Sequence, residues 1–224
     1  MSQLDNYSTF LQAGYSLQEL AAAFVRLKVL SAAWTRLKYP LRRRGPRVCI
    51  DLTVDIAGAR YIEIDDDSWI QRHVWLVVPL IAIPSVEDRA YLSIGKRVSL
   101  GRNTFIGAAN SIHVGDDVLV GPGVTITDHN HRFENPTRPI NDQGVSEGGF
   151  VEIGRDSLIG AGAVILGHRG ITIGERAVIG ANTVVTHNVP PRCVLVGNPA
   201  RIVRRLYDSD AAVQRERPVQ AAGE

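Results

Sequence analysis

Residues 94–112 read IGKRVSLGRNTFIGAANSI, with an aliphatic side chain at every sixth position. Ile94, Leu100 and Ile106 are each followed by Gly, and Ile112 closes the run. This period fits neither an α-helix, which repeats every 3.6 residues, nor an ordinary strand, which alternates every two. It is typical of a solenoid whose coils have three short flat faces, so the sequence predicts a parallel β-helix.

The same spacing recurs on both sides of this run. Further runs begin at Ile50, Ile64, Val114, Ile153 and Ile173. We expect the aliphatic side chains to stack inside the coils, and Gly to follow them where a Cβ would hinder the backbone. Ile94 to Ile112 spans three hexads, which we interpret as one coil. The two-residue slips at Ile112/Val114 and Ile171/Ile173 then mark the steps between coils.

The chain divides into three parts. Residues 1–46 lack the six-residue period, residues 47–206 carry it, and residues 207–224 form a polar tail that we expect to be disordered. Inside the repeats, Trp75 to Pro84 is more apolar and off the pattern, which favours either a strand or a surface that meets another subunit.

The first part predicts an amphipathic helix followed by a basic linker at residues 42–46. Ser16 and Glu19 have the spacing of a capping box at its start. Apolar residues follow at helical spacing, namely Leu17, Leu20, Phe24, Leu27, Trp34 and Leu37. The helix either packs on the solenoid or a neighbouring subunit, or lies on an anionic membrane surface as a peripheral contact.

The composition indicates which classes of partner and which cellular compartment to expect. The chain of 224 residues is 45% hydrophobic with a net charge of +2, so charge alone implies no nucleic-acid partner. Cys49 and Cys193 are far apart without metal-ligand spacing, which favours free thiols in the reducing cytoplasm. No secretory signal or membrane-spanning stretch is evident, so we expect a cytoplasmic protein.

One long loop interrupts the repeats. The pattern is clear to Ile126 and resumes at Ile153, which predicts an excursion over residues 128–150. It opens with Asp128-His129-Asn130-His131, and a neutral histidine beside a carboxylate is suited to general-base catalysis near neutral pH. No serine nucleophile elbow, P-loop or dinucleotide fingerprint is present.

Metal binding is an alternative use of these histidines. His129 and His131 are two residues apart, so on an extended strand both side chains would face the same side. His113 lies three hexads before His131. Three histidines are sufficient ligands for a catalytic zinc site. We favour the absence of a metal, because the close pair is spaced differently from the zinc sites of β-helical carbonic anhydrases.

The hexads, the Asp-His-Asn-His loop and the segment IGANTVVTHNVPPRCVLVGNPARIVRR at residues 179–205 resemble the hexapeptide-repeat acyltransferases. The resemblance covers residues 90–206, is most specific at Gly197 to Ala200, and is strongest to maltose, galactoside and nodulation O-acetyltransferases and their relatives in polysaccharide biosynthesis. It implies a mainly β fold, a left-handed parallel β-helix with an N-terminal helix and a protruding loop. It also implies a trimer with sites between subunits and direct transfer from acetyl-CoA, as co-substrate, to a sugar or glycan hydroxyl.

The resemblance also implies roles for particular residues. In that family the catalytic histidine is the eighth residue counted from the aliphatic residue that follows the coil's Pro-Gly. Counted from Val124, which follows Pro122-Gly123, the eighth residue is His131, so the resemblance favours His131 as the base, with His129 as the alternative. Asn103, Asn110 and Asp128 are candidates for binding the acceptor. The residues that correspond to acetyl-CoA contacts are Ala161, Ala181, Thr186, Arg201 and Arg204. His187 stands where relatives often have Lys, which puts one phosphate contact in doubt.

Two alternatives remain open at this point. In the first alternative, the enzyme is an acyltransferase whose acceptor is an amino sugar, an antibiotic or serine, because hexads alone do not distinguish between these acyltransferases. In the second, the chain is a β-helical scaffold without catalytic activity.

Overall fold

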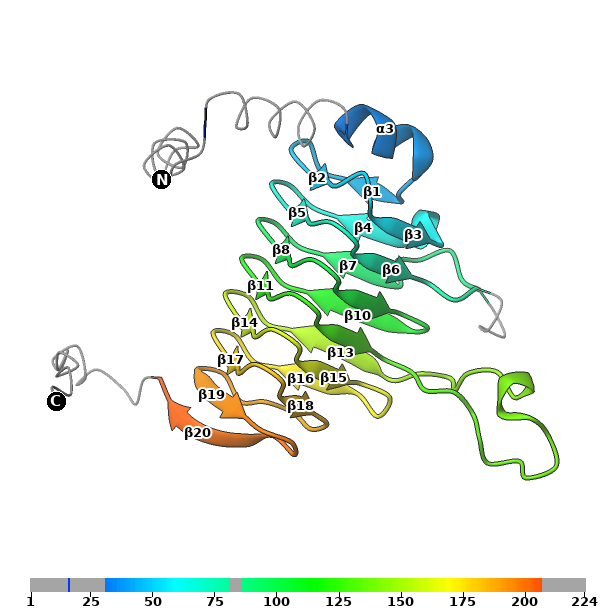
Figure 1. Ribbon diagram of the computed structural model, residues 1–224, viewed down its shortest axis with the longest axis vertical. Helices are drawn as coiled ribbons and strands as arrows, with labels where there is room; N and C mark the ends of the chain where they lie inside the picture. Colours follow the sequence, from blue (N-terminus) through cyan, green and yellow to red (C-terminus); the bar gives the residue numbers. More distant parts are fainter. Residues whose placement is uncertain (1–15, 17–30, 81–85, 207–224) are drawn as a thin grey trace, which may run out of the picture.

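The protein is a stack of β-coils with three flat faces (Figure 1). The computed structural model describes residue 16, residues 31–80 and residues 86–206. Each face is a sheet in which a strand pairs in parallel with the equivalent strands of the coils before and after it. Backbone groups are thereby satisfied between coils rather than within them.

The three faces are named in chain order. Face 1 consists of β1 (Arg43–Arg44), β4 (Ile62–Ile64), β7 (Leu92–Ile94), β10 (Ser111–Val114), β13 (Phe150–Ile153) and β16 (Ile171–Ile173). Face 2 consists of β2 (Cys49–Ile50), β5 (Trp69–Ile70), β8 (Ser99–Leu100), β11 (Leu119–Val120), β14 (Leu158–Ile159), β17 (Val178–Ile179), β19 (Cys193–Val196) and β20 (Arg201–Arg205). Face 3 consists of β3 (Asp55–Ala57), β6 (Trp75–Val77), β9 (Phe105–Gly107), β12 (Thr125–Thr127), β15 (Val164–Leu166) and β18 (Val184–Val185).

The regular coil is longer than the three hexads expected from the sequence. Ile94 pairs with Val114, and Leu92 pairs with Ile112, so one coil includes three hexads and the two-residue slip. Each face 1 strand from β4 to β16 directs two aliphatic side chains inward, because residues two apart on a strand share a side. The slip therefore lies within each face 1 strand from β4 to β16, and the final coil, in which Ile179 pairs with Leu195, is shorter.

Glycine after the inward aliphatic residue allows the coils to approach closely. A Cβ on Gly121 would lie 2.7 Å from the backbone nitrogen of Ala161 on the next coil. The left-handed backbone of the corners falls on other residues, such as Arg97 with φ 56° and Asn103 with φ 59°. The hexad glycine is thus selected by contact between coils, while the turn itself accepts side chains.

Two excursions leave the stack between face 3 and face 1. The first was not anticipated: Ile64 pairs with Ile94, so this coil is half as long again as the one from Ile94 to Val114. Within it, Trp75 to Val77 forms β6 in phase with the repeats, and Leu76 is buried. The second, residues 128–149, lies between β12 and β13 and projects from the stack in green (Figure 1). Both excursions therefore emerge from the same edge, here called corner 3–1.

The two ends of the solenoid differ from the expectation in detail. Arg43 and Arg44, assigned to a linker from the sequence, form β1 and pair with Glu63 and Ile64. At the other end β20 returns antiparallel to β19, and all five of its residues are exposed.

A short helix covers the start of the stack. In α3 (Ser31–Lys38), Trp34 and Leu37 are exposed, whereas Thr35 and the following Tyr39 are buried. The apolar stripe predicted through Trp34 and Leu37 therefore does not face the coils in this chain. The predicted Leu17, Leu20, Phe24, Leu27 and the tail at 207–224 lie outside the described residues. No helix in the described part of the chain is long and apolar enough to cross a membrane.

Candidate active site

The candidate site lies at the foot of the long excursion, where β12 ends and the chain leaves corner 3–1. The backbone N–H of Gly149 donates to the Asp128 carbonyl at 2.6 Å, so the two ends of the excursion meet at this point. Asp128 and His129 are therefore held by the rigid stack, although they begin a loop.

Asp128 is fully buried, and its carboxylate is bound inside the protein. Its Oδ1 accepts the Ala109 N–H at 2.8 Å, and its Oδ2 accepts the N–H groups of Asn110 at 2.8 Å and Ser111 at 2.7 Å. Three backbone donors of the neighbouring coil thus compensate for burying the charge. Asp128 is a candidate for acceptor binding by sequence, but both of its carboxylate oxygens accept hydrogen bonds from the protein itself.

His129 is oriented by this buried carboxylate. Its Nδ1 lies 2.9 Å from Asp128 Oδ1, and 13% of its side chain is exposed. Because the carboxylate oxygen accepts, Nδ1–H is the donor, which leaves the Nε2 lone pair free to take a proton. Nε2 forms no hydrogen bond with the part of the chain that the structure describes.

A glycine makes room for the imidazole. A Cβ on Gly107 would lie 3.2 Å from His129 Cε1 and 3.1 Å from the Phe105 ring. The register explains the contact, since Gly107 pairs with Thr127, two residues before the histidine. Gly107 belongs to a hexad, and nothing in its sequence context distinguished it from the other hexad glycines.

His131 occupies a different environment. It is exposed on the excursion, and its backbone forms an isolated antiparallel bridge with Val145. His113 is exposed on β10, where its neighbours are Ser93 and Glu152 rather than His131. Across residues 31–80 and 86–206, no three His, Cys, Asp or Glu residues gather in a way that could hold a metal ion. The three-histidine zinc alternative thus has no geometric support.

The asparagine candidates fall at two corners. Asn110 lies beside the site, but its side-chain amide is engaged, because Nδ2 donates to the Gly149 carbonyl at 2.7 Å and Oδ1 accepts from Arg89 at 2.8 Å. Asn103 is exposed between β8 and β9, at the corner of faces 2 and 3. One chain therefore does not bring Asn103 to His129.

Arg89 is a residue that sequence reasoning missed. Its Nη1 donates to the Asn110 carbonyl at 2.8 Å, its Nη2 donates to Asn110 Oδ1, and its guanidinium lies 4.1 Å from the centre of the Tyr91 ring. The first excursion is thereby joined, through Asn110, to the residues that hold Asp128. No sequence signal marks such an anchor, since it lies outside the repeat.

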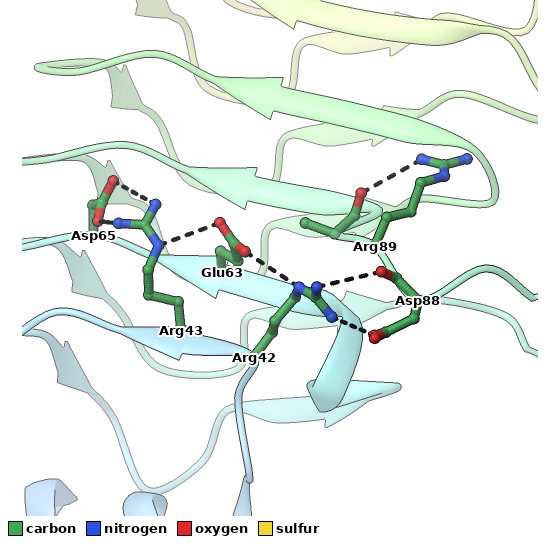
Figure 2. Close-up of polar contacts among 7 residues, drawn as sticks. Arg42, Arg43, Glu63, Asp65, Asp88 and Arg89 are labelled. Carbon is green, nitrogen blue, oxygen red and sulfur yellow. Dashed lines mark hydrogen bonds and ion pairs between the residues drawn. The ribbon is translucent and has the colours of Figure 1, made fainter.

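Charged residues fix the end of the first excursion to face 1. Figure 2 shows Arg42 between Glu63 and Asp88, next to the pair of Arg43 and Asp65. Arg42 Nε lies 3.4 Å from Glu63 Oε1, and its Nη1 lies 2.5 Å from Asp88 Oδ1. The segment that carries Arg89 is therefore attached on two sides.

The residues proposed for acetyl-CoA are distributed along the last coils. Ala161 and Ala181 stand on adjacent coils at the corner of faces 2 and 3, where the Asn182 N–H donates to the Ala161 carbonyl. Thr186 follows β18, and its hydroxyl contacts His187 Nδ1 at 2.8 Å. Arg201 and Arg204 are exposed on β20. The structure brings the two alanines together, and it places the two arginines on the terminal strand.

Neither cysteine is arranged as a nucleophile. Both are buried, and the Cys193 thiol donates to the Pro190 carbonyl at 2.9 Å. Burial raises the pKa of the Cys193 thiol, which disfavours the reactive thiolate.

Comparisons with known proteins agree with the repeat and the fold. A family profile described as "Hexapeptide repeat of succinyl-transferase" matches residues 91–128 and 150–187, on either side of the long excursion. The chain is 34% identical to a probable acetyltransferase of Mycobacterium tuberculosis over 176 residues, which is 76% of this chain and 53% of that protein. It is 34% identical to galactoside O-acetyltransferase of Escherichia coli over 131 residues, which is 56% of this chain and 62% of that enzyme. The match thus spans about half to three-fifths of these relatives' length.

A solved structure has the same architecture. The N-acyltransferase AntD of Bacillus cereus, in complex with dTDP and 3-hydroxybutyryl-CoA, superposes with a TM-score of 0.65 at 18% identity, covering 81% of this chain and 91% of that chain. At this identity the similarity concerns the fold, a left-handed parallel β-helix. The hexads, the profile and the curated relatives together identify residues 91–128 and 150–187 as repeats of the hexapeptide-repeat acyltransferase family.

Proposed function

We propose that the protein transfers an acetyl group from acetyl-CoA to a hydroxyl of a sugar or glycan precursor. The observation that carries this proposal is the pair of Asp128 and His129, in which a buried carboxylate holds Nδ1 and leaves Nε2 free. This arrangement suits a general base at neutral pH. The family, and the names of the relatives as acetyltransferases, support the donor and the type of reaction.

The proposed reaction is a direct transfer. Nε2 of His129 removes the proton of the acceptor hydroxyl while its oxygen attacks the thioester carbonyl carbon. The carbon–sulfur bond breaks, and the CoA thiolate takes the proton back from the imidazolium. Atoms and charge balance without an acyl-enzyme, in keeping with the burial of both cysteines.

The base proposed here differs from the first choice of the sequence analysis. Spacing favours His131, whereas orientation and burial support His129. A base needs a fixed geometry, and His129 has a carboxylate partner and a glycine pocket, while His131 is exposed on the excursion. Asp128 then acts as a positioning residue rather than as an acceptor ligand.

Thiol release from acetyl-CoA tests the proposal with a panel of acceptors. His129→Ala should lower turnover by about 10²- to 10⁴-fold, the usual contribution of a general base. His131→Ala should have a much smaller effect, and His113→Ala, an exposed histidine on face 1, serves as the control. A large loss in His131→Ala with an active His129→Ala would reassign the base to His131.

We propose acetyl-CoA contacts at Ala161, Ala181, Thr186, Arg201 and Arg204. Alanine at 161 and 181 leaves space along the corner for a chain-like ligand, and the exposed guanidinium groups of β20 suit phosphates. Calorimetry with CoA separates the enzyme from a scaffold without activity, because a scaffold would not bind CoA.

Transfer to an amino group is the second candidate. It is favoured by the shared fold with AntD, an N-acyltransferase whose structure contains dTDP. Rates measured with matched sugars and amino sugars distinguish the two acceptors.

We further propose a homotrimer in which subunits complete one another's sites. Trp69 on face 2 and Trp75 on face 3 are 43% and 49% exposed, and the Trp75 and Phe105 rings lie 5.0 Å apart. Aromatic side chains on an outer surface are typical of interfaces. Asn103, which is remote from His129 in its own chain, is then a candidate to bind the acceptor in a neighbour's site. Light scattering would give the mass of a monomer if this proposal is wrong.

The N-terminal segment is proposed to contact a second surface. In its described part, Trp34 and Leu37 are 53% and 83% exposed, next to Arg36 and Lys38. Co-sedimentation with anionic vesicles tests a peripheral membrane contact. Absence of binding would favour a neighbouring subunit as the surface that this segment contacts. Two cysteines in the reduced state fit the reducing cytoplasm that we propose as the compartment.

A further inference from the structure

The corner between faces 2 and 3, here called corner 2–3, carries a ladder of equivalent residues. On successive coils the residue before the left-handed turn position accepts a backbone hydrogen bond from the next coil: Asn103 to Arg72, Gly123 to Arg102, Gly162 to Pro122 and Asn182 to Ala161. The ladder therefore runs Arg72, Arg102, Pro122, Ala161, Ala181. Two arginines stand next to each other at one end, and two alanines at the other.

The two arginines lie on adjacent coils, whose backbones are separated by the spacing of paired strands, about 4.8 Å. Both side chains are exposed, and neither forms an ion pair within residues 31–80 and 86–206. Asp51 stands one coil earlier, beside Gln71, but its Oδ1 already accepts from the Thr53 N–H and hydroxyl at 2.9 Å and 2.7 Å.

The corner between faces 1 and 2 shows how the same fold arranges arginines that stabilise it. There each arginine meets a carboxylate of an adjacent coil: Arg47 with Asp67, Arg97 with Asp117, Arg176 with Asp156 and Arg192 with Glu175. At corner 2–3, Arg72 and Arg102 are adjacent like charges without such a carboxylate among the described residues. Such a pair is unfavourable alone and becomes favourable when an anion lies between the two groups.

A groove lies at this position. It has a volume of about 410 Å³ and is lined by Arg72, Arg102, Leu119, Pro122, Leu158 and Ala161, among others. Leu119 and Leu158 are 51% and 37% exposed, so the groove offers apolar contacts next to its two cations. A groove of this size accommodates an organic molecule rather than an isolated ion.

We propose that Arg72 and Arg102 bind a phosphate group carried by an organic ligand whose body lies against Leu119, Pro122 and Leu158. Guanidinium groups match phosphate oxygens in a forked, two-point geometry. The ligand is either CoA, reaching down the ladder from Ala161, or a phosphorylated acceptor. The site lies at a different corner from His129, so it does not depend on the assignment of the base.

The first experiment uses inorganic pyrophosphate as the probe. Calorimetry at low salt compares the full chain with Arg72→Ala/Arg102→Ala and with Arg47→Ala/Arg97→Ala, which removes the same charge from the corner where arginines are paired. Pyrophosphate binding should weaken at least tenfold in the first double variant and remain within twofold of the wild type in the second. No binding by the wild type, or equal weakening in both variants, would overturn the site.

The second experiment identifies the source of the phosphate by titrating CoA and glucose 1-phosphate, with glucose as the uncharged control. Weaker CoA binding in Arg72→Ala/Arg102→Ala assigns the phosphate to the donor. Unchanged CoA binding with weaker binding of glucose 1-phosphate assigns it to the acceptor. Retention of both ligands at wild-type affinity contradicts the proposal. These binding measurements stand even if no acetyl transfer is detected, so the failure of the proposed function and of this site are distinguishable.

Discussion

The stacked coils and the long excursion hold their residues in different ways. In the coils, most strands pair on both sides, and the inward aliphatic residues are almost completely buried. In the excursion, residues 130–142 are all exposed, and the two arms are joined near the foot by the bonds from Ser146 to Asn130 and from Arg132 to Gly144. One region is a continuous core, and the other is an exposed loop held by hydrogen bonds at its base and among its own residues.

This difference favours the junction of the two regions as the place for the proposed chemistry. A base must be oriented, which the stack can do, and it must also reach a substrate, which requires the chain to leave the stack. Asp128 is the last residue enclosed by the coil, and His129 is the first that emerges from it. The candidate site lies where the two regions meet, and the following substitutions compare one region with the other.

The largest contrast is expected between two isoleucines. Ile126 is fully buried between Ile106 and Ile165 of the adjacent coils, whereas Ile140 in the excursion is 58% exposed. Ile126→Ala should lower the free energy of unfolding by about 2–5 kcal/mol, as for other deletions in a packed core. Ile140→Ala should leave it nearly unchanged. Denaturant unfolding measures both, and an equal cost for Ile140→Ala would mean that the excursion is packed in the assembled protein.

A slightly smaller effect is expected at the boundary. Asp128→Ala leaves three backbone N–H groups at Ala109, Asn110 and Ser111 without their acceptor and should cost about 3 kcal/mol of unfolding free energy. It should also lower turnover, because His129 loses its orienting partner. Asp142→Ala, an exposed carboxylate of the excursion, is the control. If the two variants unfold alike, Asp128 does not stabilise the foot of the excursion.

A third pair compares glycines. In Gly121→Ala the new methyl group meets the backbone of Ala161 at 2.7 Å, so the coils must separate, at a cost of about 1–3 kcal/mol. Gly144 in the excursion has φ +76° with nothing near its Cβ position, and Gly144→Ala should cost about 1 kcal/mol through backbone strain alone. Thermal unfolding of the two variants checks the order, and a more damaging Gly144→Ala would reverse it.

The smallest effect concerns the paired charges. The Arg97 guanidinium, with Nε 2.5 Å from Asp117 Oδ1, holds the pKa of that carboxyl below its usual range. Because the folded-state pKa is lowered, the stabilisation is present above the ordinary value of about 3.9 and is lost as the pH falls through the lowered value. Both groups are exposed, so Arg97→Ala should hardly change the melting temperature. NMR titration should show the pKa of Asp117 returning to its usual range in the variant; an unchanged titration would mean that Arg97 is not the cause.

Much of the stack was predictable, because its repeat is local. The spacing of Ile94, Leu100 and Ile106 predicts three faces, and the loss of the pattern after Ile126 predicts the excursion. The coil length was wrong because one strand of each coil buries two residues rather than one, a distinction that a count of hexads does not contain. The first excursion was missed because the apolar stretch from Trp75 to Pro84 was interpreted as a strand or an intersubunit surface, and only the pairing of Ile64 with Ile94 shows the extra residues.

The candidate site was predictable as a place but not as an arrangement. The sequence alone supplied two histidines beside a carboxylate at the end of a coil. Only the tertiary structure decided that Asp128 turns inward to three N–H groups of the adjacent coil, that Gly107 makes room for His129, and that Arg89 holds Asn110. The physical reason is that the repeat encodes contacts between equivalent positions of neighbouring coils, which recur at fixed spacing. The partners of Asp128, Asn110 and Arg89 are instead set by where two irregular segments meet, and such contacts do not recur at a fixed spacing in the sequence.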